Sequence, residues 1–424
     1  MELTEANLEK ISNLGIQTPK YSRNDLKRSI VHIGLGNFHR AHQACYLNDL
    51  INQTDCKEWS ITGLEIRGNP LMKSSFPKQS CLYTLTERSS TDSKTRVIGS
   101  IVDYVYAADD AGLALKTLMS EEVKIVSLTV TEKGYNQDKR TGKLDLSHPE
   151  ILHDLDRKNS PKTAVGLISW AIKLRREAGV PEFTVMCCDN LSENGEMLKS
   201  LVSQFVKKLD SGNLELIEFV DKQMCFPNTM VDRITPATSN ETRNYVKSLG
   251  IVDEVPVMSE DFIQWVIEDK FSRGRPNWGI LDNVSLVADV VPYELIKLRI
   301  LNAGHFALSY PAALLNIQKV DDAMNVELLS NFVASYMTSV EPSLPKGLLD
   351  VQEYKTTVVQ RFKNPAISDQ IERLLMDGSS KFNEFVCGAL EFLVENGCDY
   401  RAQYGKMEKK CILKEKWNFW VKLT

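Results

Sequence analysis

The chain has 424 residues, which is more than one hydrophobic core usually holds, so two domains are expected. Hydrophobic residues make up 43% of the chain and charged residues 25%, a globular balance that argues against extended disorder. The 56 acidic and 51 basic residues give a net charge of −5, so composition offers no electrostatic reason to expect a nucleic-acid or membrane partner.

The amino-terminal segment MELTEANLEKISNLG lacks the apolar core of a secretory signal. No apolar stretch of the chain approaches the roughly 20 residues that are needed to span a bilayer. The nine cysteines are scattered, without a CxxC pair or zinc-ligand spacing. These features predict a cytoplasmic protein whose cysteines are reduced thiols.

The first half of the chain alternates short β-branched runs with longer helical patterns, which is typical of a parallel sheet with crossover helices. The predicted strands have a nearly continuous apolar character that fits burial on both faces, and they span residues 29–33, 59–64, 99–106, 123–130 and 183–186. The predicted helices span residues 41–52, 110–119, 163–178 and 194–209.

Beyond Val290 the β-rich runs nearly disappear and apolar residues follow helical spacing. The proline-containing segment VADVVPYE marks the change. The sequence therefore predicts an α/β, Rossmann-type dinucleotide-binding domain at residues 1–289 and a mostly α-helical substrate-binding domain at residues 290–424. The stretch at residues 406–424, with six lysines and two tryptophans, fits either a short helical cap or a disordered tail.

The run SIVHI leads directly into a glycine turn and then a helical segment, the order that a dinucleotide fingerprint requires. Gly34 would permit the tight turn, and Gly36 would let the backbone approach a pyrophosphate at a helix amino terminus. The usual third glycine is absent and His39 stands in its place. A GxG pair alone is weak, because a strand that simply ends in a turn can carry one.

The coenzyme remains open at this point. Glu65, the carboxylate nearest the end of the second predicted strand, could bind the ribose hydroxyls of NAD. Arg67 could instead face the 2′-phosphate of NADP.

One segment of the second domain brings together a base, an amide and an imidazole, namely Lys297, Asn302 and His305. On a straight α-helix these side chains fall within an arc of about 140°, and Lys297 and His305 lie about 12 Å apart along the axis. Gly304 could relax the helix locally. Taken alone, Lys297 is more simply a surface lysine and His305 a core histidine.

Six motifs together resemble the long-chain mannitol dehydrogenase family of polyol and hexuronate oxidoreductases. They are GxGxFHRAH at residues 34–42, CDNLxxNG at 188–195, MVDRITP at 230–236, WVIEDKF at 265–271, the Lys297–Asn302–His305 block and DGSSKF at 377–382. The polyol-specific members are the most similar. The resemblance implies a metal-independent enzyme that transfers hydride between carbon 2 of a sugar alcohol, D-mannitol, and NAD or NADP, giving the ketose D-fructose.

The resemblance also assigns roles to individual residues. Lys297 would be the general acid/base, Asn190 and Asn302 the amides that polarise the carbonyl, and His305 an imidazole that positions the substrate. Asp232, Arg373 and Lys381 would bind the outer hydroxyls of the polyol, and Glu294 would help to move protons to solvent. The residues assigned to the cofactor are Gly34, Gly36, Phe38, His39, Arg40 and Asn69.

These roles agree with the chemistry of alcohol oxidation. The hydroxyl must lose a proton as hydride leaves carbon 2, and a lysine, with a reference pKa of about 10.4, becomes a useful base only when burial or nearby cations lower its pKa. Two amide donors would stabilise the developing alkoxide without a zinc ion. The six histidines are mostly dispersed, so no metal site is expected.

Two departures from the family pattern bear on function. NAD-preferring members carry an acidic pair where this chain has Asn69-Pro70, and the loss of that charge would remove repulsion against a 2′-phosphate, so NADP or dual use stays open. Family members also continue for several more helices, so the carboxyl-terminal domain is expected to be shortened or replaced.

Other functions fit the residues less well. A nucleotide-binding relative without catalysis would have no use for a base and two polarising amides together, and a Rossmann-like methyltransferase would have none for the lysine. A hexuronate reductase of the same family is the nearer alternative, because Arg373 and Lys381 could serve a carboxylated substrate. For the assembly, the sequence suggests a monomer or a weak homo-oligomer.

Overall fold

The computed structural model describes residues 1–67, 69–108, 110–138, 140–156, 160–376 and 378–398. The lysine- and tryptophan-rich stretch at residues 406–424 lies outside the described residues, as does Asp377 of the DGSSKF motif. The chain divides into two compact units. Unit 1 comprises Met1–Arg88 and Ser93–Val290, and unit 2 comprises Ser89–Asp92 and the chain from Val291 onward.

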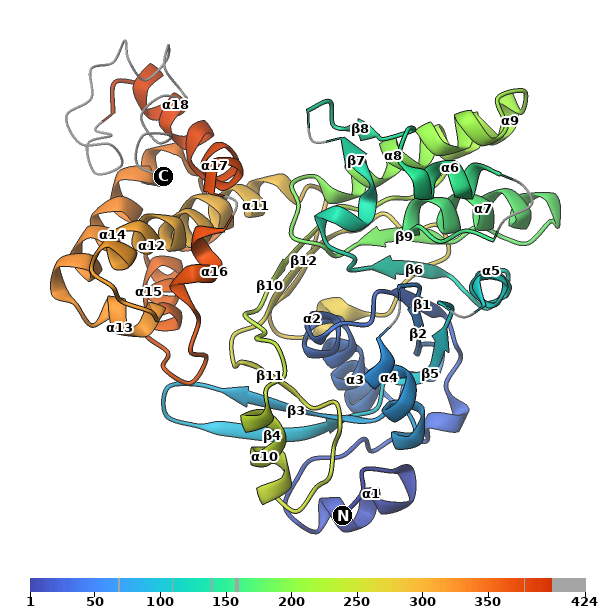
Figure 1. Cartoon of the computed structure of the whole chain (residues 1–424), viewed down its shortest axis with the longest axis horizontal. Coiled ribbons are helices and arrows are strands. Elements are labelled where there is room, and N and C mark those ends of the chain that lie inside the picture. The colour runs from blue at the N-terminus through green and yellow to red at the C-terminus, as the bar shows by residue number, and fades with distance from the viewer. Residues whose placement is uncertain (68, 109, 139, 157–159, 377, 399–424) are drawn as a thin grey trace. The chain divides into compact units, whose positions relative to one another are not determined.

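Unit 1 is built on a five-stranded parallel sheet with the strand order β5-β2-β1-β6-β9 (Figure 1). The chain lays down β1, β2 and β5 in one direction and then β6 and β9 in the other, so the order reverses between β1 and β6. The strands span Ile30–Ile33 (β1), Ile61–Glu65 (β2), Ile101–Tyr106 (β5), Ile125–Leu128 (β6) and Thr184–Cys187 (β9). Each overlaps a predicted strand, and the Rossmann-type fold is confirmed.

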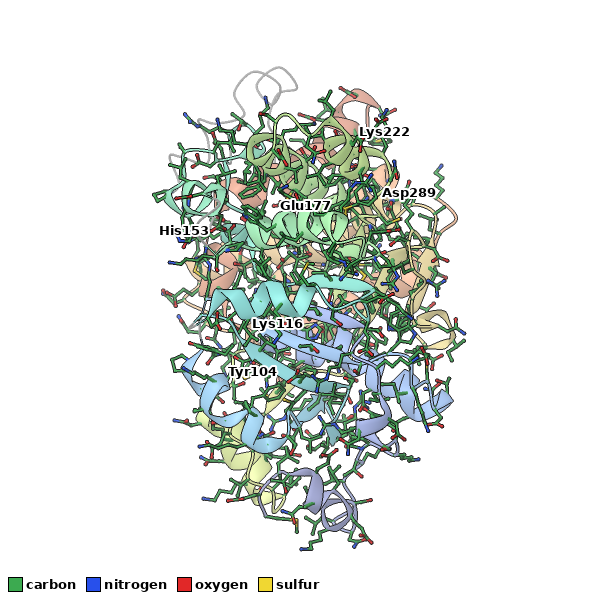
Figure 2. The ribbon with its side chains drawn as sticks, turned by 90° about the vertical axis from the view of Figure 1, so that its right-hand side faces the viewer. Tyr104, Lys116, His153, Glu177, Lys222 and Asp289 are labelled. Carbon is green, nitrogen blue, oxygen red and sulfur yellow. The ribbon has the colours of Figure 1, made fainter. Side chains whose placement is uncertain are left out.

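Both faces of this sheet are buried. Successive side chains of a strand point to opposite faces, and here each face packs into a different core cluster. Val31 and Val126 belong to one core cluster, whereas their neighbours Ile30 and Ile125 belong to another. The first cluster packs under α5 (Ala111–Leu118), α6 (Pro149–Leu155), α7 (Ala164–Glu177), α8 (Asn194–Leu209) and α9 (Leu214–Lys222). The second packs under α3 (Gln43–Thr54). Figure 2 views the side on which α5 carries Lys116 and α7 carries Glu177.

The helix predicted at residues 41–52 is two helices. A short helix α2 (Asn37–Ala41) follows the glycine turn, and α3 begins one residue later. His42 joins them, with a φ of −118° and a ψ of −88° that no helix contains. The break turns the chain directly after the FHRA part of the cofactor motif.

Two three-stranded sheets, absent from the predicted elements, complete unit 1 with a short hairpin. One has the order β10-β12-β13 and the other β11-β3-β4. Their strands, with those of the hairpin β7-β8, span Thr229–Asp232 (β10), Gln264–Glu268 (β12), Val284–Val287 (β13), Val257–Glu260 (β11), Tyr83–Arg88 (β3), Ser93–Ile98 (β4), Gln137–Asp138 (β7) and Lys143–Leu144 (β8). The remaining helices of this unit are α1 (Leu8–Ser12), α4 (Pro70–Ser75) and α10 (Asn240–Ser248).

The described part of unit 2 is helical, as predicted, apart from an isolated bridge between Lys319 and Gln370. A single core cluster, with Ile300 and Met337 at full burial, joins its helices. The helices are α11 (Val291–Lys297), α12 (Ala303–Leu314), α13 (Val320–Met324), α14 (Glu327–Val340), α15 (Val351–Phe362), α16 (Ile371–Leu375), α17 (Gly378–Lys381) and α18 (Gly388–Glu395). Two π-helical turns, η6 (Leu298–Asn302) and η8 (Phe382–Cys387), interrupt this pattern.

Candidate active site

The carboxyl ends of β1 and β6 form the place where the strand order of the large sheet reverses. In open α/β sheets, ligands bind outside the carboxyl ends of the strands at such a reversal. The glycine turn follows β1, Glu65 ends β2 and Asn190 follows β9. The glycine turn assigned to the cofactor and Asn190, assigned to catalysis, therefore lie along one edge of this sheet.

The two glycines of the turn have different tasks. Gly34 has a φ of 89°, and a Cβ there would lie 2.3 Å from the carbonyl oxygen of Thr129. Only glycine fits, because both the backbone conformation and the neighbouring carbonyl exclude a side chain. Gly36, at the start of α2, borders open space. Gly34 thus packs the loop against the end of β6, and Gly36 leaves backbone that a pyrophosphate can approach.

Side-chain hydrogen bonds connect this glycine turn to the end of β6. The Thr129 hydroxyl donates to the Gly34 carbonyl oxygen at 3.0 Å and lies 2.9 Å from Nε2 of His32. Nδ1 of His32 lies 2.8 Å from the Ser127 hydroxyl. Burial lowers the pKa of His32 to about 3, so the ring is neutral. Since Thr129 uses its hydrogen on Gly34, Nε2 carries the proton of His32 and donates it to Thr129.

The residues after the glycine turn have protein contacts of their own. His39 is buried and stacks on His32 with ring centroids 3.4 Å apart. The guanidinium of Arg40 is buried and donates to the carbonyl oxygen of Val255 at 2.5 Å. Phe38 packs, partly buried, against the core beneath α3. These contacts support the loop from inside, and a direct contact of Phe38, His39 or Arg40 with the cofactor stays a prediction.

Three residues at or after the end of β2 bear on the choice of coenzyme. Asn69 caps α4, because its side-chain oxygen accepts a hydrogen bond from the Met72 amide at 3.2 Å. Arg67 forms an exposed ion pair with Glu150 at 2.8 Å. Glu65 accepts from the backbone N–H of Arg67 at 3.4 Å. The neutral cap at Asn69 leaves this edge compatible with either coenzyme.

Residues of the CDNLxxNG motif hold the backbone around Asn190 by hydrogen bonds and close packing. Asn194 donates to the carbonyl oxygens of Asp189 and Thr229, both at 2.9 Å, and accepts from the Thr229 amide at 3.0 Å. A Cβ at Gly195 would lie 2.5 Å from the Pro227 carbonyl oxygen, so α8 can approach the strand β10 only with glycine there. The backbone that carries Asn190 is therefore fixed between β9 and β10.

The MVDRITP motif fixes a second predicted site residue. Asp232 ends β10 and is buried. Its neighbour Arg233 donates to the carbonyl oxygens of Glu260, at 2.8 and 3.1 Å, and of Ala41, at 2.5 Å, and pairs with the Glu87 carboxylate at 2.6 Å. Burial would raise the pKa of Glu87, but the guanidinium groups beside it bring that pKa below its usual value. Arg233 thus joins the end of β10 to α2, β3 and β11.

In unit 2, Lys297 is the last residue of α11 and its residue surface is only 6% exposed. Glu294, one helical turn earlier, is also buried. The next five residues form the π-helical turn η6, which ends at Asn302, and α12 follows directly. The straight α-helix used to estimate the arc and the distance from the sequence therefore does not describe residues 297–305, which contain a π-helical turn. Hydrogen bonds that span five residues instead of four widen the helix before Gly304, not at it.

An aspartate that the sequence analysis did not select links the other predicted residues of unit 2. Asp369 accepts two hydrogen bonds from the Arg373 guanidinium, at 2.6 and 2.8 Å. Burial would raise the pKa of Asp369, but Arg373 and the nearby His305 lower it. Lys381 donates to the carbonyl oxygen of Arg373 at 3.3 Å. The structure thus brings His305, Arg373 and Lys381 into one neighbourhood.

Both π-helical turns of unit 2 directly follow a lysine assigned to the site. Lys297 precedes η6 and Lys381 precedes η8, and the two turns contact each other. π-Helical turns are costly and occur frequently at functional sites. Nothing in the sequence marked either of them. By contrast, Asp189 and Arg233 stand inside the quoted motifs, so a signal for them existed beside Asn190 and Asp232.

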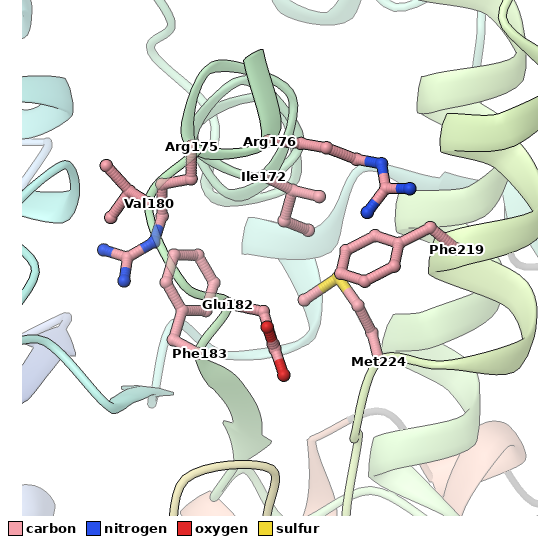
Figure 3. Close-up of a pocket in the computed structure, with 8 residues that line it drawn as sticks. All are labelled: Ile172, Arg175, Arg176, Val180, Glu182, Phe183, Phe219 and Met224. Atoms are coloured by element: carbon pink, nitrogen blue, oxygen red, sulfur yellow. The ribbon is translucent and has the colours of Figure 1, made fainter. Parts of the chain in front are cut away.

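Other features of the described residues do not compete with this site. A cavity of about 40 Å³ lies between α7, α9 and the start of β9, lined by apolar side chains such as Phe183 and Met224 with Arg176 at its rim (Figure 3). That volume holds about one to three water molecules, not a sugar alcohol. Among the described residues, no three His, Cys, Asp or Glu side chains are grouped as metal ligands. Within the same residues, every helix is too short or too polar to cross a membrane.

Two family models match the chain. The mannitol dehydrogenase Rossmann domain matches residues 28–280, and the mannitol dehydrogenase C-terminal domain matches residues 289–403. The first match falls in unit 1 apart from Ser89–Asp92, the second falls in unit 2 apart from its first two residues, and together the matches include the residues assigned above.

Individual relatives agree with this match. A mannitol dehydrogenase of Saccharomyces cerevisiae is 39% identical over 373 residues, which is 87% of this chain and 74% of that protein. A polyol:NADP oxidoreductase of Gluconobacter oxydans is 39% identical over 378 residues, 87% of this chain and 76% of that protein. The structure of Pseudomonas fluorescens mannitol 2-dehydrogenase with NAD and D-mannitol is 41% identical, with a TM-score of 0.87 over 95% of this chain and 82% of that one.

Proposed function

Because this chain belongs to the mannitol dehydrogenase family, it is an NAD(P)-dependent polyol dehydrogenase, and we propose that D-mannitol and D-fructose are its substrates. The observation that carries the catalytic part is the burial of Lys297 directly before the π-helical turn that ends at Asn302. NAD(P), when bound, takes the hydride from carbon 2 of the alcohol or returns it to the ketone.

Lys297 acts as the base in alcohol oxidation and as the acid in the reverse reaction. In its neutral form, Lys297 accepts the hydroxyl proton as hydride leaves, and the resulting ammonium returns it in the reverse reaction. Glu294 lies one turn away on the same helix and can pass that proton towards solvent. Glu294 and Lys297 are both buried, so this exchange takes place away from bulk water.

Two amides stabilise the oxygen on which charge develops. The side chains of Asn190 and Asn302 can each donate an N–H to that oxygen, and donors already in place when the charge develops are the most effective. His305 orients the substrate, and its stacking on Phe362 at 3.8 Å supports a fixed ring. Asp232, Arg373 and Lys381 bind the outer hydroxyls. These roles rest on the match to the family motifs, residue by residue.

Gly34 and Gly36 fit a dinucleotide, because the turn packs tightly on one side and its backbone is open on the other. Phe38, His39, Arg40 and Asn69 complete the proposed cofactor site. We propose that both NAD and NADP are used, since Asn69 brings no charge to oppose a 2′-phosphate. We further propose a cytoplasmic enzyme that is a monomer or a weak homo-oligomer.

The test is the oxidation of NADH and of NADPH with D-fructose, followed by absorbance, with fructuronate in parallel. Turnover with fructose, at a kcat/KM at least about tenfold above that with fructuronate, is expected. Preferential turnover with fructuronate would instead assign the chain to hexuronate reduction. Coenzyme binding without turnover of any polyol would assign it to nucleotide binding alone.

A further inference from the structure

The turn after β6 is strained. Thr131 has a φ of 63° and a ψ of 163°, a combination that is essentially restricted to glycine. Threonine branches at Cβ and tolerates positive φ poorly. Residues held in such conformations persist only where their surroundings over-determine them, and they cluster at functional sites. Something beside Thr131 must therefore hold it.

The Asp189 carboxylate holds this turn. It accepts hydrogen bonds from the backbone N–H groups of Val130 and Thr131, at 2.9 and 3.0 Å, and from the Tyr135 hydroxyl at 2.5 Å. Hydrogen bonds to a charged acceptor are about twice as strong as neutral ones. Burial nevertheless raises the pKa of Asp189, so the carboxylate stands where its charge is costly. A structure that keeps a costly carboxylate against a strained turn gains something from the turn.

The turn belongs to a continuous hydrogen-bonded path along the carboxyl edge of the sheet. At β1, the Gly34 carbonyl oxygen accepts from Thr129. At β6, residues 129–131 run from that contact to the Thr131 amide, which donates to Asp189. At β9, Asp189 directly precedes Asn190, and its own carbonyl oxygen is held by Asn194. The path joins the glycine turn of the cofactor site to the amide proposed for catalysis.

We propose that Asp189 is a positioning residue, which holds the strained turn at Thr131 and the following amide of Asn190 in the arrangement that hydride transfer requires. The inference rests on the proposed function. A dinucleotide whose adenosine half lies over the end of β2 places its nicotinamide half on the other side of β1, over β6 and β9. Thr131 and Asn190 lie at those two strand ends. Asp189 is hydrogen-bonded to the first and adjacent in sequence to the second, so it fixes the distance between them beneath the nicotinamide ring.

The variant Asp189→Asn tests this, because it keeps the shape and replaces one acceptor oxygen by an amide that opposes a backbone N–H. We expect faster hydrogen–deuterium exchange at the amides of Val130 and Thr131, measured without coenzyme. We expect kcat with fructose to fall at least about tenfold, since a misplacement of about 1 Å can cost about 100-fold. The Kd of NADH, measured by fluorescence, should change less than about threefold, because the adenosine half is held elsewhere.

Two further variants separate positioning from general destabilisation. Tyr135→Phe removes one hydrogen bond to Asp189 but keeps both that hold the turn, so it should leave kcat within about threefold of wild type. Thr131→Gly lets the backbone adopt the same conformation without strain. Added to Asp189→Asn, it should restore kcat to within about threefold of the Thr131→Gly single variant.

Unchanged exchange at residues 130 and 131 in Asp189→Asn would overturn the proposal, and so would an equal loss of kcat in Tyr135→Phe or no recovery in the double variant. If wild type turns over no polyol, the proposed function fails. The exchange measurement then still decides whether Asp189 holds the turn.

Discussion

Lys297 and Lys173 are the two lysines with buried residue surfaces in the described chain. Lys173 is held by the carboxylates of Glu177 and Asp210, the latter at 2.9 Å, and its pKa is raised: its burial opposes the charge, but these two partners more than offset it. Such a lysine stays protonated and serves stability. Lys297 instead directly precedes the π-helical turn η6. Substituting each of these two buried lysines therefore compares a lysine proposed for catalysis with a lysine that stabilises the fold.

The Lys297→Met variant keeps the length and apolar stem of the side chain and removes the acid/base group. We expect kcat for fructose reduction to fall by about 100- to 10,000-fold, the usual contribution of a general acid. NADH binding, measured by fluorescence, should be retained. Lys173→Met is the control, and it should lower the melting temperature while leaving kcat within about twofold. Similar kcat values for the two variants would remove Lys297 from the mechanism.

Asn69 permits a test of coenzyme choice by charge alone. Asp and Asn are equally good helix caps, so Asn69→Asp should keep the cap on α4 and add one negative charge. That charge should repel a 2′-phosphate, and we expect the ratio of kcat/KM for NADPH over NADH to fall by about tenfold, equivalent to about 1.4 kcal/mol. Asn69→Ser, a neutral cap, should leave the ratio unchanged. An equal ratio in both variants would show that Asn69 does not face the 2′ position.

His32 predicts how unit 1 responds to acid. Its pKa is lowered to about 3 in the folded chain, against about 6.5 when unfolded, so below pH 6.5 only the unfolded chain takes up this proton. The free energy of unfolding should therefore be fully present above pH 6.5 and fall by about 1.4 kcal/mol per pH unit as the pH drops towards 3.

The His32→Gln variant can keep the hydrogen bond to Thr129 and has no proton to gain. In urea titrations between pH 6.5 and 5, the free energy of unfolding of this variant should fall less steeply with decreasing pH than that of wild type. The variant lacks the one proton that His32 takes up on unfolding. Asp189 and Asp253, whose pKa values are raised by burial, act in both proteins and cancel in the difference. Parallel slopes would show that His32 is not neutral through this range.

At the scale of elements, the π-helical turn η6 sets the angle between Lys297 and the residues of α12. Inserting one alanine after Leu298 should rotate Lys297 by about 100° relative to Asn302 and His305, because each added α-helical residue turns the helix by about 100°. We expect kcat to fall by about 100-fold with NADH binding retained. The substitution Leu298→Ala keeps the turn and should keep most of the activity. Full activity of the insertion variant would mean that the angle set by this turn has no catalytic purpose.

The elements also show what the sequence could and could not predict. The five strands of the large sheet were predicted because burial on both faces leaves continuous apolar runs, as in β1 and β6. The hairpin β3–β4 was missed because its polar residues, such as those of Ser93–Ile98, follow no strong alternation. The break at His42 and the turn η6 were missed because tertiary packing, not local propensity, decides where a helix breaks or widens.

The residues of the candidate site could be assigned from the sequence only where a motif contains them. Asn190 and Asp232 came from motif matches, and so did the roles of residues in unit 2. Asp369 was missed because no motif contains it and because its meaning depends on Arg373 and His305, which it meets only in the fold. A carboxylate that orients other side chains leaves no spacing signal of its own.

At the scale of the whole molecule, both family models fall within the chain, while the chain spans 74% of the Saccharomyces cerevisiae relative and 82% of the Pseudomonas fluorescens structure. Each of the two units contributes residues to the proposed chemistry, with the glycine turn and Asn190 in unit 1 and Lys297 and Asn302 in unit 2. Under these proposed roles, catalysis would need both units, so we expect turnover only from a protein that contains both.

The roles proposed for Asn190, Asn302 and Lys297 also predict that the enzyme needs no metal ion. A zinc ion in an alcohol dehydrogenase polarises the oxygen and lowers the barrier to losing its proton. Here Asn190 and Asn302 would supply the polarisation and Lys297 the proton acceptor, so both tasks are covered by side chains. Dialysis of the whole protein against EDTA should leave kcat and KM for fructose unchanged, and added Zn²⁺ should not raise them. A loss of turnover that Zn²⁺ restores would show that the amides do not polarise the substrate alone.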